Sequence, residues 1–119
     1  MNPGSKILLV DDSDEFRHMV KLTLESKGYT VVEASDGDQG LEQFQASEFA
    51  AAVVDYDMPG LNGIDLSKAI KKINPKFPIL MITAYSNRLS LEEIFAIGIN
   101  AYLPKPLQID KFLKVVEQL

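Results

Sequence analysis

Hydrophobic and polar positions along the chain follow two alternating patterns. Short, nearly uninterrupted apolar runs are typical of strands that are covered on both faces. Between and after these runs, apolar residues recur three or four positions apart, which is typical of amphipathic helices. The runs predict five strands, over residues 6–10, 30–34, 51–55, 78–83 and 101–103.

Five helices are predicted to follow the five strands. The first helical pattern begins near Phe16 and ends at Gly28, and the fourth ends at Gly98, because glycine is common where a helix stops. Asp36 and Gln39 have the spacing of a capping box for the second helix. The apolar faces comprise Phe16, Val20 and Leu24; Leu41 and Phe44; Leu66, Ile70 and Ile73; apolar residues within 91–97; and Ile109, Phe112, Leu113, Val116 and Leu119. Alternating strands and helices predict an α/β fold, a parallel sheet with helices on both faces.

The composition indicates a cellular compartment and argues against several classes of protein. With 119 residues, 46% of them hydrophobic and 24% charged, we expect one globular domain over 1–119, in which residues 1–5 are a poorly ordered extension. The chain has no cysteine, which excludes disulfides and thiolate metal sites and fits a reducing compartment. A net charge of −5 argues against direct nucleic-acid binding, and no apolar run approaches the roughly 20 residues of a membrane span. We therefore expect a cytoplasmic protein.

Polar side chains stand at the carboxyl ends of four predicted strands. In an open parallel sheet these ends share one edge, and ligands bind there. The residues are Asp11 and Asp12 after the first strand, Asp55 and Asp57 at the third, Thr83 at the fourth and Lys105 after the fifth.

This set of side chains suits a metal ion and a phosphoryl group. At ~4 Å and an effective dielectric constant near 20, each pair of carboxylates repels by about 4 kcal/mol. Such a cluster needs a cation or a raised pKa, and oxygen ligands without histidine or cysteine favour Mg²⁺. Lys105 and Thr83 add a positive charge and a hydroxyl donor, and the Asp55 carboxylate can act as a nucleophile toward phosphorus.

Each polar residue alone also has an ordinary structural interpretation. Asp12 and Glu15 have capping-box spacing for the first helix, and Asn62-Gly63 is typical of a turn and no more. The functional interpretation rests on the complete set, which ends four different strands.

Four motifs together resemble the receiver domain of response regulators in two-component signalling. They are LLVDDS at 8–13, VVDYDMPGLNG at 53–63, ILMITAY at 79–85 and AYLPKP at 101–106. The resemblance spans Lys6–Leu119. It implies that Asp55 is the phosphoacceptor, that Asp12 binds Mg²⁺ directly and that Asp11 assists through water. Asp57 would offer its backbone carbonyl to the metal.

The resemblance also implies roles outside the acidic cluster. Thr83 would donate to the bound phosphoryl group, Lys105 would pair with it, and Ala84 would keep the space beside it open. Tyr102 would then turn inward, so that the surface of the fourth helix, fifth strand and fifth helix changes. Tyr85 occupies a place where the family tunes the lifetime of the phosphate.

The family fold is flavodoxin-like, with five parallel strands in the order 2-1-3-4-5. Pro104 agrees with this order, because proline cannot donate to a sheet ladder and belongs on an edge strand such as the fifth. The bond between Lys105 and Pro106 is typically cis in the family.

The function that the resemblance implies is a signalling switch without an external substrate, and so not an enzyme in the usual sense. A histidine kinase or histidine phosphotransfer protein would donate the phosphoryl group to Asp55, with Mg²⁺ as cofactor. The surface change would control an output domain or a downstream protein, and it also allows a phosphorylation-dependent homodimer.

Three rival interpretations fit less well. Asp55 and Asp57 match the Asp-x-Asp signature of haloacid-dehalogenase-like phosphatases, but that motif usually follows the first strand and here follows the third. A P-loop enzyme lacks its G-x-x-x-x-G-K-[ST] motif in this chain. A module that signals by binding alone would not need the complete set of acids, Thr83 and Lys105.

Overall fold

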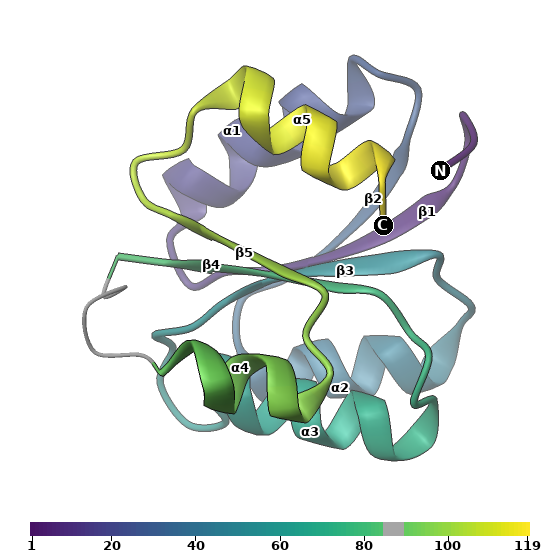
Figure 1. Ribbon diagram of the computed structural model, residues 1–119. Coiled ribbons are helices and arrows are strands. Elements are labelled where there is room, and N and C mark those ends of the chain that lie inside the picture. The colour runs from purple at the N-terminus through teal and green to yellow at the C-terminus, as the bar shows by residue number, and fades with distance from the viewer. Residues whose placement is uncertain (85–89) are drawn as a thin grey trace.

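The computed structural model describes residues 1–84 and 90–119. In these residues five parallel strands form one sheet in the order β2-β1-β3-β4-β5, and a helix follows each strand (Figure 1). The elements are β1 (Lys6–Val10), α1 (Asp14–Glu25), β2 (Thr30–Ala34), α2 (Gly37–Ala46), β3 (Ala51–Asp55), α3 (Gly63–Ile73), β4 (Ile79–Thr83), α4 (Leu91–Ile97), β5 (Ala101–Pro104) and α5 (Ile109–Glu117). The predicted fold class and strand order are confirmed. Tyr85 lies outside the described residues.

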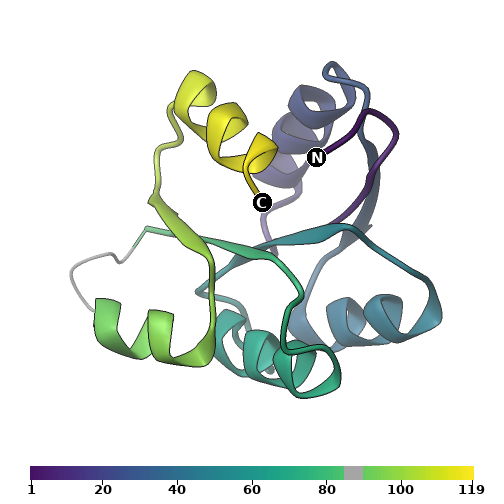
Figure 2. The same ribbon diagram turned by 45° about the vertical axis from the view of Figure 1, so that its right-hand side comes forward.

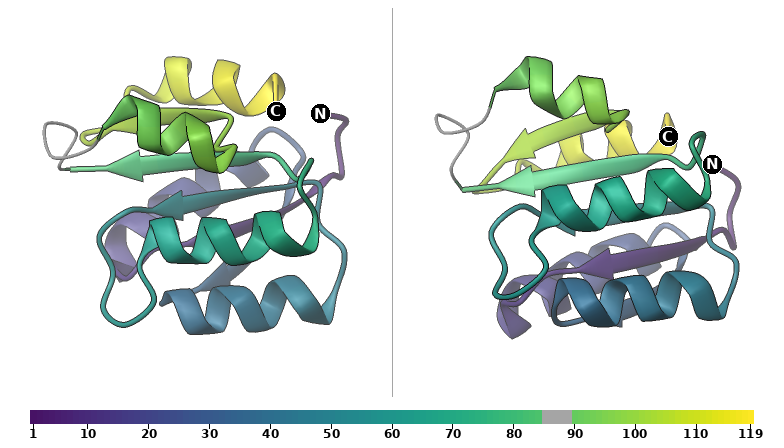
Figure 3. Two further views of the ribbon diagram at one scale, coloured as in Figure 1. Left: turned by 60° about the horizontal axis from the view of Figure 1, so that its bottom comes forward. Right: turned by 90° about the horizontal axis from the view of Figure 1, so that it is seen from below.

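The helices cover both faces of the sheet. α1 and α5 lie on one face, and α2, α3 and α4 lie on the other (Figures 1 and 2). On that second face α3 lies between α2 and α4 (Figure 3). Because successive side chains of a strand point to opposite faces, Leu8 and Val10 pack beneath α2, α3 and α4, whereas Ile7 and Leu9 pack beneath α1 and α5. The central strands are therefore covered on both sides, as their apolar runs predict.

Helix α1 begins one residue later than the capping-box spacing predicts. Ser13 is its N-cap, and the Ser13 hydroxyl accepts a hydrogen bond from the Phe16 amide at 3.3 Å. The interpretation of Asp12 and Glu15 as a capping box is therefore wrong. The Asp12 carboxylate is exposed and is left available to the edge of the sheet.

Helices α2 and α3 also begin with side-chain caps. The Gln39 amide donates to Asp36 Oδ1 at 2.8 Å, which confirms the predicted cap of α2. The Asp65 amide donates to Asn62 Oδ1 at 2.9 Å, so Asn62 caps α3 and Gly63 is its first residue. The interpretation of Asn62-Gly63 as only a turn is wrong, because this dipeptide starts a helix.

The edge strand β5 has the features expected of the last strand. Within residues 1–84 and 90–119 it pairs with β4 alone, and it includes Pro104 opposite Thr83, one residue beyond the predicted range. Strand β4 begins at Ile79 and excludes Pro78. The peptide bond between Lys105 and Pro106 is cis, as the resemblance implies. The loop that carries Lys105 thus leaves directly from the sheet edge.

The N-terminal residues lie against the rest of the domain. The Met1 ammonium donates to the Glu117 carbonyl at 2.6 Å, and the Gly4 amide donates to the Gly28 carbonyl at 2.8 Å. Among the described residues, no helix is long and apolar enough to cross a membrane.

Candidate functional site

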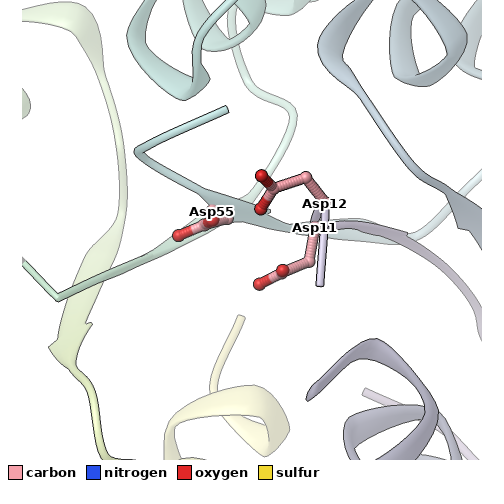
Figure 4. Close-up of side chains that lie close together, drawn as sticks. All are labelled: Asp11, Asp12 and Asp55. Carbon is pink, nitrogen blue, oxygen red and sulfur yellow. The ribbon is translucent and has the colours of Figure 1, made fainter. Parts of the chain in front are cut away.

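The carboxyl ends of the adjacent strands β1 and β3 bring three acids together. β1 and β3 pair in parallel with Val10 opposite Val54, so the residues that follow, Asp11 and Asp55, lie side by side. Within the described residues, one carboxylate oxygen each from Asp11, Asp12 and Asp55 lies within 4.8 Å of the other two (Figure 4). The edge rule for parallel sheets thus placed this cluster correctly.

The pKa of Asp55 is determined mainly by its burial. Asp55 is 4% exposed and Asp11 is 1% exposed, whereas Asp12 faces solvent. Burial raises the pKa of Asp55 to about 6, and the negative charge of Asp11 adds to the rise, while the positive charge of Lys105 opposes it. At neutral pH the Asp55 carboxyl is therefore mostly ionised in a poorly solvated position.

Lys105 reaches this cluster from the loop after β5. Its Nζ lies 3.1 Å from Asp11 Oδ2 and 3.5 Å from Asp55 Oδ1. The backbone of the loop is tied to β4, because the Lys105 amide donates to the Thr83 carbonyl at 2.8 Å. One ammonium thus contacts two buried carboxylates, which leaves the three-acid cluster with a net negative charge.

Arg17 supports the loop between β1 and α1. Its Nη1 donates to the Asp11 carbonyl at 2.7 Å, its Nη2 lies 2.7 Å from Asp14 Oδ1, and its Nε lies 3.2 Å from Glu33 Oε1. The Ser13 amide donates to Asp11 Oδ1 at 2.8 Å. The sequence interpretation did not identify this role. The available signal was an arginine in the first two turns of the helix that follows the acids.

Gly63 allows α3 to lie against the end of β3. Its amide donates to the Tyr56 carbonyl at 3.0 Å, and a Cβ at this position would clash with the Asp55 carbonyl and lie 2.8 Å from Tyr56 Cα. No side chain larger than hydrogen fits without a backbone shift. The loop from Asp55 to α3 is thereby held close to the strand end.

The other predicted residues lie around the same edge. Asp12, Asp55, Asp57, Ala84 and Lys105 line an open cleft of about 180 Å³. Thr83 is fully buried at the end of β4, and Tyr102 is half-buried in β5, opposite Met81. The structure thus brings three of the four predicted acids together with Ala84 and Lys105 in one cleft, and the fourth, Asp11, contacts Lys105 beside it.

The cluster fits a hard divalent cation. Its donors are carboxylate oxygens, two of the three acids are buried, and the single charge of Lys105 does not balance theirs. The exposed Asp12 and the open cleft leave room for the water ligands that Mg²⁺ usually keeps. The residues present therefore suit Mg²⁺.

A five-stranded parallel sheet with an acidic cluster, a buried threonine and a lysine at one edge is the arrangement of a receiver domain. The family model of the response regulator receiver domain matches residues 7–117, and the chain belongs to this family. Its acidic cluster is of the kind typical of the phosphorylation and magnesium site of these signalling switches.

Particular relatives share most of the chain. It is 34% identical to the chemotaxis protein CheY of Pseudomonas aeruginosa over 117 residues, which cover 96% of this chain and 94% of that protein. The structure of the chemotaxis protein CheY4 of Vibrio cholerae, crystallized at low pH, matches with a TM-score of 0.88 and 34% identity, covering 97% of this chain and 98% of that one. The response regulator TrrA of Thermotoga maritima, solved in complex with Mg²⁺ and BeF, matches with a TM-score of 0.88 and 28% identity, covering 96% and 97%.

Proposed function

We propose that this receiver domain is switched by phosphorylation of Asp55. The observation that carries the proposal is the Asp55 carboxylate itself, 4% exposed at the end of β3 and opening onto the cleft that Asp12 and Lys105 also line. A histidine kinase or histidine phosphotransfer protein would supply the phosphoryl group. As one Asp55 oxygen bonds to phosphorus, the bond from phosphorus to the donor imidazole breaks, and the product is a mixed anhydride.

Mg²⁺ is the cofactor that we propose for this transfer. Asp11, Asp12 and Asp55 would hold it through carboxylate oxygens or water, and Asp57 would contribute its backbone carbonyl. When bound, the ion would neutralise charge that develops on the phosphoryl oxygens. The Mg²⁺ and BeF in the related TrrA structure support this assignment.

Thr83 at the end of β4 and Lys105 in the loop after β5 would act on the phosphoryl group. Lys105 Nζ lies 3.5 Å from Asp55 Oδ1, so a short movement would pair the ammonium with a phosphoryl oxygen. Thr83 ends β4 on the side of Asp55 away from β1, and its hydroxyl would donate to a second oxygen. Together with the acidic cluster, these two residues would surround a phosphoryl group on Asp55.

The phosphoryl group would change the surface formed by α4, β5 and α5. It adds about −1.5 to −2 of charge beside Thr83, and Thr83 pairs in register with Pro104 of β5. Tyr102, two residues earlier on β5, would turn inward as Thr83 moves. The result is a population shift between two packings of one surface.

The proposed setting follows from this switch. The domain would work in the cytoplasm, without an external substrate, with a kinase or phosphotransfer protein upstream and a protein or output domain downstream. Residues 1–119 would form the single receiver domain, and a phosphorylation-dependent homodimer is one form that the output can take.

Incubation with acetyl phosphate and Mg²⁺, followed by intact mass measurement, tests this function. We expect one added phosphoryl group on the parent and none on Asp55→Asn, with Asp57→Asn as the matched loss of a nearby acid that keeps the addition. Equal labelling of the parent and Asp55→Asn would contradict the proposal. Steady hydrolysis of a generic phosphate ester would instead favour a phosphatase.

A further inference from the structure

The ammonium of Lys105 has an aromatic neighbour besides the two carboxylates. Its Nζ lies 4.2 Å from the centroid of the Phe16 ring, over the ring face. The same atom lies 3.1 Å from Asp11 Oδ2 and 3.5 Å from Asp55 Oδ1. The ammonium is thus bounded by two anions and one ring, and Phe16 has no part in the phosphoryl chemistry described above.

We propose that Phe16 is a positioning residue for Lys105. The face of its ring holds the ammonium beside Asp11 and Asp55, where it is ready for an incoming phosphoryl group. This inference rests on the proposed function, because it gives Phe16 a part in phosphoryl uptake at Asp55.

The position of Phe16 is fixed by the start of α1. Its amide donates to the Ser13 hydroxyl that caps this helix, and its side chain packs with the apolar cluster that includes Val20 one turn later. A phenyl ring on a capped helix has two side-chain torsions, whereas lysine has four and loses more freedom when it is held in place. The rigid partner therefore restricts the flexible one.

An aromatic ring suits this position better than an acid or an aliphatic side chain. The ring face attracts a cation through its quadrupole but carries no net charge. A carboxylate at position 16 would add to the repulsion among Asp11, Asp12 and Asp55 and would compete with phosphate for the lysine. An aliphatic side chain would fill the space without attracting the ammonium.

The strength of the contact also fits a residue that must move. A cation above a ring is held more weakly than a cation paired with an anion at the same distance. A phosphoryl dianion on Asp55 can therefore draw Lys105 away from Phe16. The ring orients the ammonium before transfer and does not retain it afterwards. Loss of the ring should therefore change the rate at which Asp55 is phosphorylated.

Rates of phosphorylation by acetyl phosphate in Mg²⁺ test this role with five proteins: the parent, Phe16→Leu, Phe16→Tyr, Lys105→Met and the double variant Phe16→Leu with Lys105→Met. Loss of the ring should slow uptake by about two- to fivefold, the factor expected of a partly exposed cation–π contact. Phe16→Tyr keeps a ring and should keep the parental rate. In the Lys105→Met background, Phe16→Leu should have no further effect.

A spectroscopic measurement tests the contact without phosphate. In the parent, the ε-methylene protons of Lys105 should be shifted upfield by the ring current of Phe16. The shift should persist in Phe16→Tyr and disappear in Phe16→Leu, and the dispersion of the same spectra reports whether each variant is folded.

Three results would overturn the inference. One is a Phe16→Leu variant that takes up phosphate at the parental rate. Another is equal slowing with and without Lys105, which would mean that Phe16 acts only through packing. The third is a parent spectrum without the ring-current shift. A parent that takes up no phosphoryl group would overturn the proposed function as well, so the two failures are distinguishable.

Discussion

At the scale of single residues, the site depends on keeping one carboxylate both buried and ionised. Burial and the charge of Asp11 raise the pKa of Asp55 to about 6, and Lys105 limits the rise. The Asp55 carboxylate is therefore charged at neutral pH in a place where its charge is poorly solvated. Such an anion destabilises the free protein and is available to a cation or to phosphorus.

We expect Asp55→Asn to be more stable than the parent at pH 7.5 in the presence of a metal chelator. The folded protein binds a proton at Asp55 more readily than the unfolded chain does, so the parent loses stability as the pH rises from about 4 to above 6. A pKa raised from 3.8 to about 6 corresponds to at most about 3 kcal/mol in the free energy of unfolding. Urea unfolding of both proteins between pH 4 and pH 7.5 measures the difference.

The difference between the two proteins should shrink toward pH 4, where Asp55 is protonated in the folded state. Asp57→Asn, which removes an exposed acid from the same cleft, controls for the loss of one negative charge. Two results would show that burial of the ionised Asp55 does not destabilise the protein. One is a parent as stable as Asp55→Asn at pH 7.5, and the other is a difference in the free energy of unfolding that does not decrease toward pH 4.

Mg²⁺ should stabilise the parent and fail to stabilise Asp12→Ala. Binding to the folded state alone adds about 2.7 kcal/mol to the free energy of unfolding when free Mg²⁺ is 100 times its dissociation constant. Asp57→Ala should keep this stabilisation, because only its backbone carbonyl is proposed to bind. Thermal unfolding with and without Mg²⁺ measures both. Equal loss in Asp12→Ala and Asp57→Ala would mean that the Asp57 side chain is also a ligand.

At the scale of elements, the start of α3 fixes the loop behind Asp55. Gly63 has no room for a methyl group, since its Cβ would meet the backbone of Asp55 and Tyr56. Gly40 of α2 is also close to its neighbours, but the nearest atoms are side-chain carbons of Val10 and Leu66 at 3.0–3.2 Å. Side chains can shift where backbone atoms cannot.

Gly63→Ala should therefore lower the free energy of unfolding by about 1 to 3 kcal/mol, the usual cost of overpacking. Gly40→Ala is the matched control and should lose less, because the helix propensity of alanine offsets part of the cost. Denaturant unfolding at one pH compares the two. If Gly63→Ala were as stable as Gly40→Ala, the contact between α3 and the end of β3 would leave room for a methyl group, contrary to the distances at Gly63.

The elements themselves were largely predictable from the sequence. β1, β2 and β3 match the apolar runs, because buried parallel strands leave a clear signal. The cap of α1 was assigned to the wrong residue, because Asp12, Ser13 and Asp14 all favour the N-terminus of a helix and spacing does not choose among them. The residue types therefore predicted the start of α1 to within one residue. Which of the three residues is the N-cap could be seen only in the structure, where Ser13 caps the helix and Asp12 lies at the acidic cluster.

At the scale of the whole molecule, the proposed switch requires that the site alter a distant surface. Thr83 is the residue that we propose to link the two, since it is buried at the end of β4 and pairs with Pro104 of β5. On α4, Leu91 is 46% exposed and Phe95 is 52% exposed, so a change there alters an apolar contact surface.

Phosphorylation should change amide hydrogen exchange in α4, β5 and α5, and Thr83→Ala should reduce that change while still accepting phosphate. The methyl side chain cannot donate to the phosphoryl group, so the charge at Asp55 no longer biases β5. Thr30→Ala, at an exposed position on the opposite edge strand, is the control. Exchange changes of parental size in phosphorylated Thr83→Ala would contradict this coupling.

Only part of the site could be predicted from the sequence. The acids at 11, 12 and 55 could be brought together because parallel strands share one carboxyl edge. The ring of Phe16 beside Lys105 and the bond from Arg17 to the Asp11 carbonyl could not, because they depend on side-chain rotamers and on how α1 sits over the sheet.

Identification of the aspartate that carries the phosphoryl group tests the central claim most directly. Protein treated with acetyl phosphate and Mg²⁺ would be reduced with borohydride, which converts an aspartyl phosphate to homoserine, and digested for tandem mass spectrometry. We predict homoserine at position 55 and unmodified aspartate at positions 11, 12 and 57. Homoserine at any of those three positions, with Asp55 intact, would contradict it.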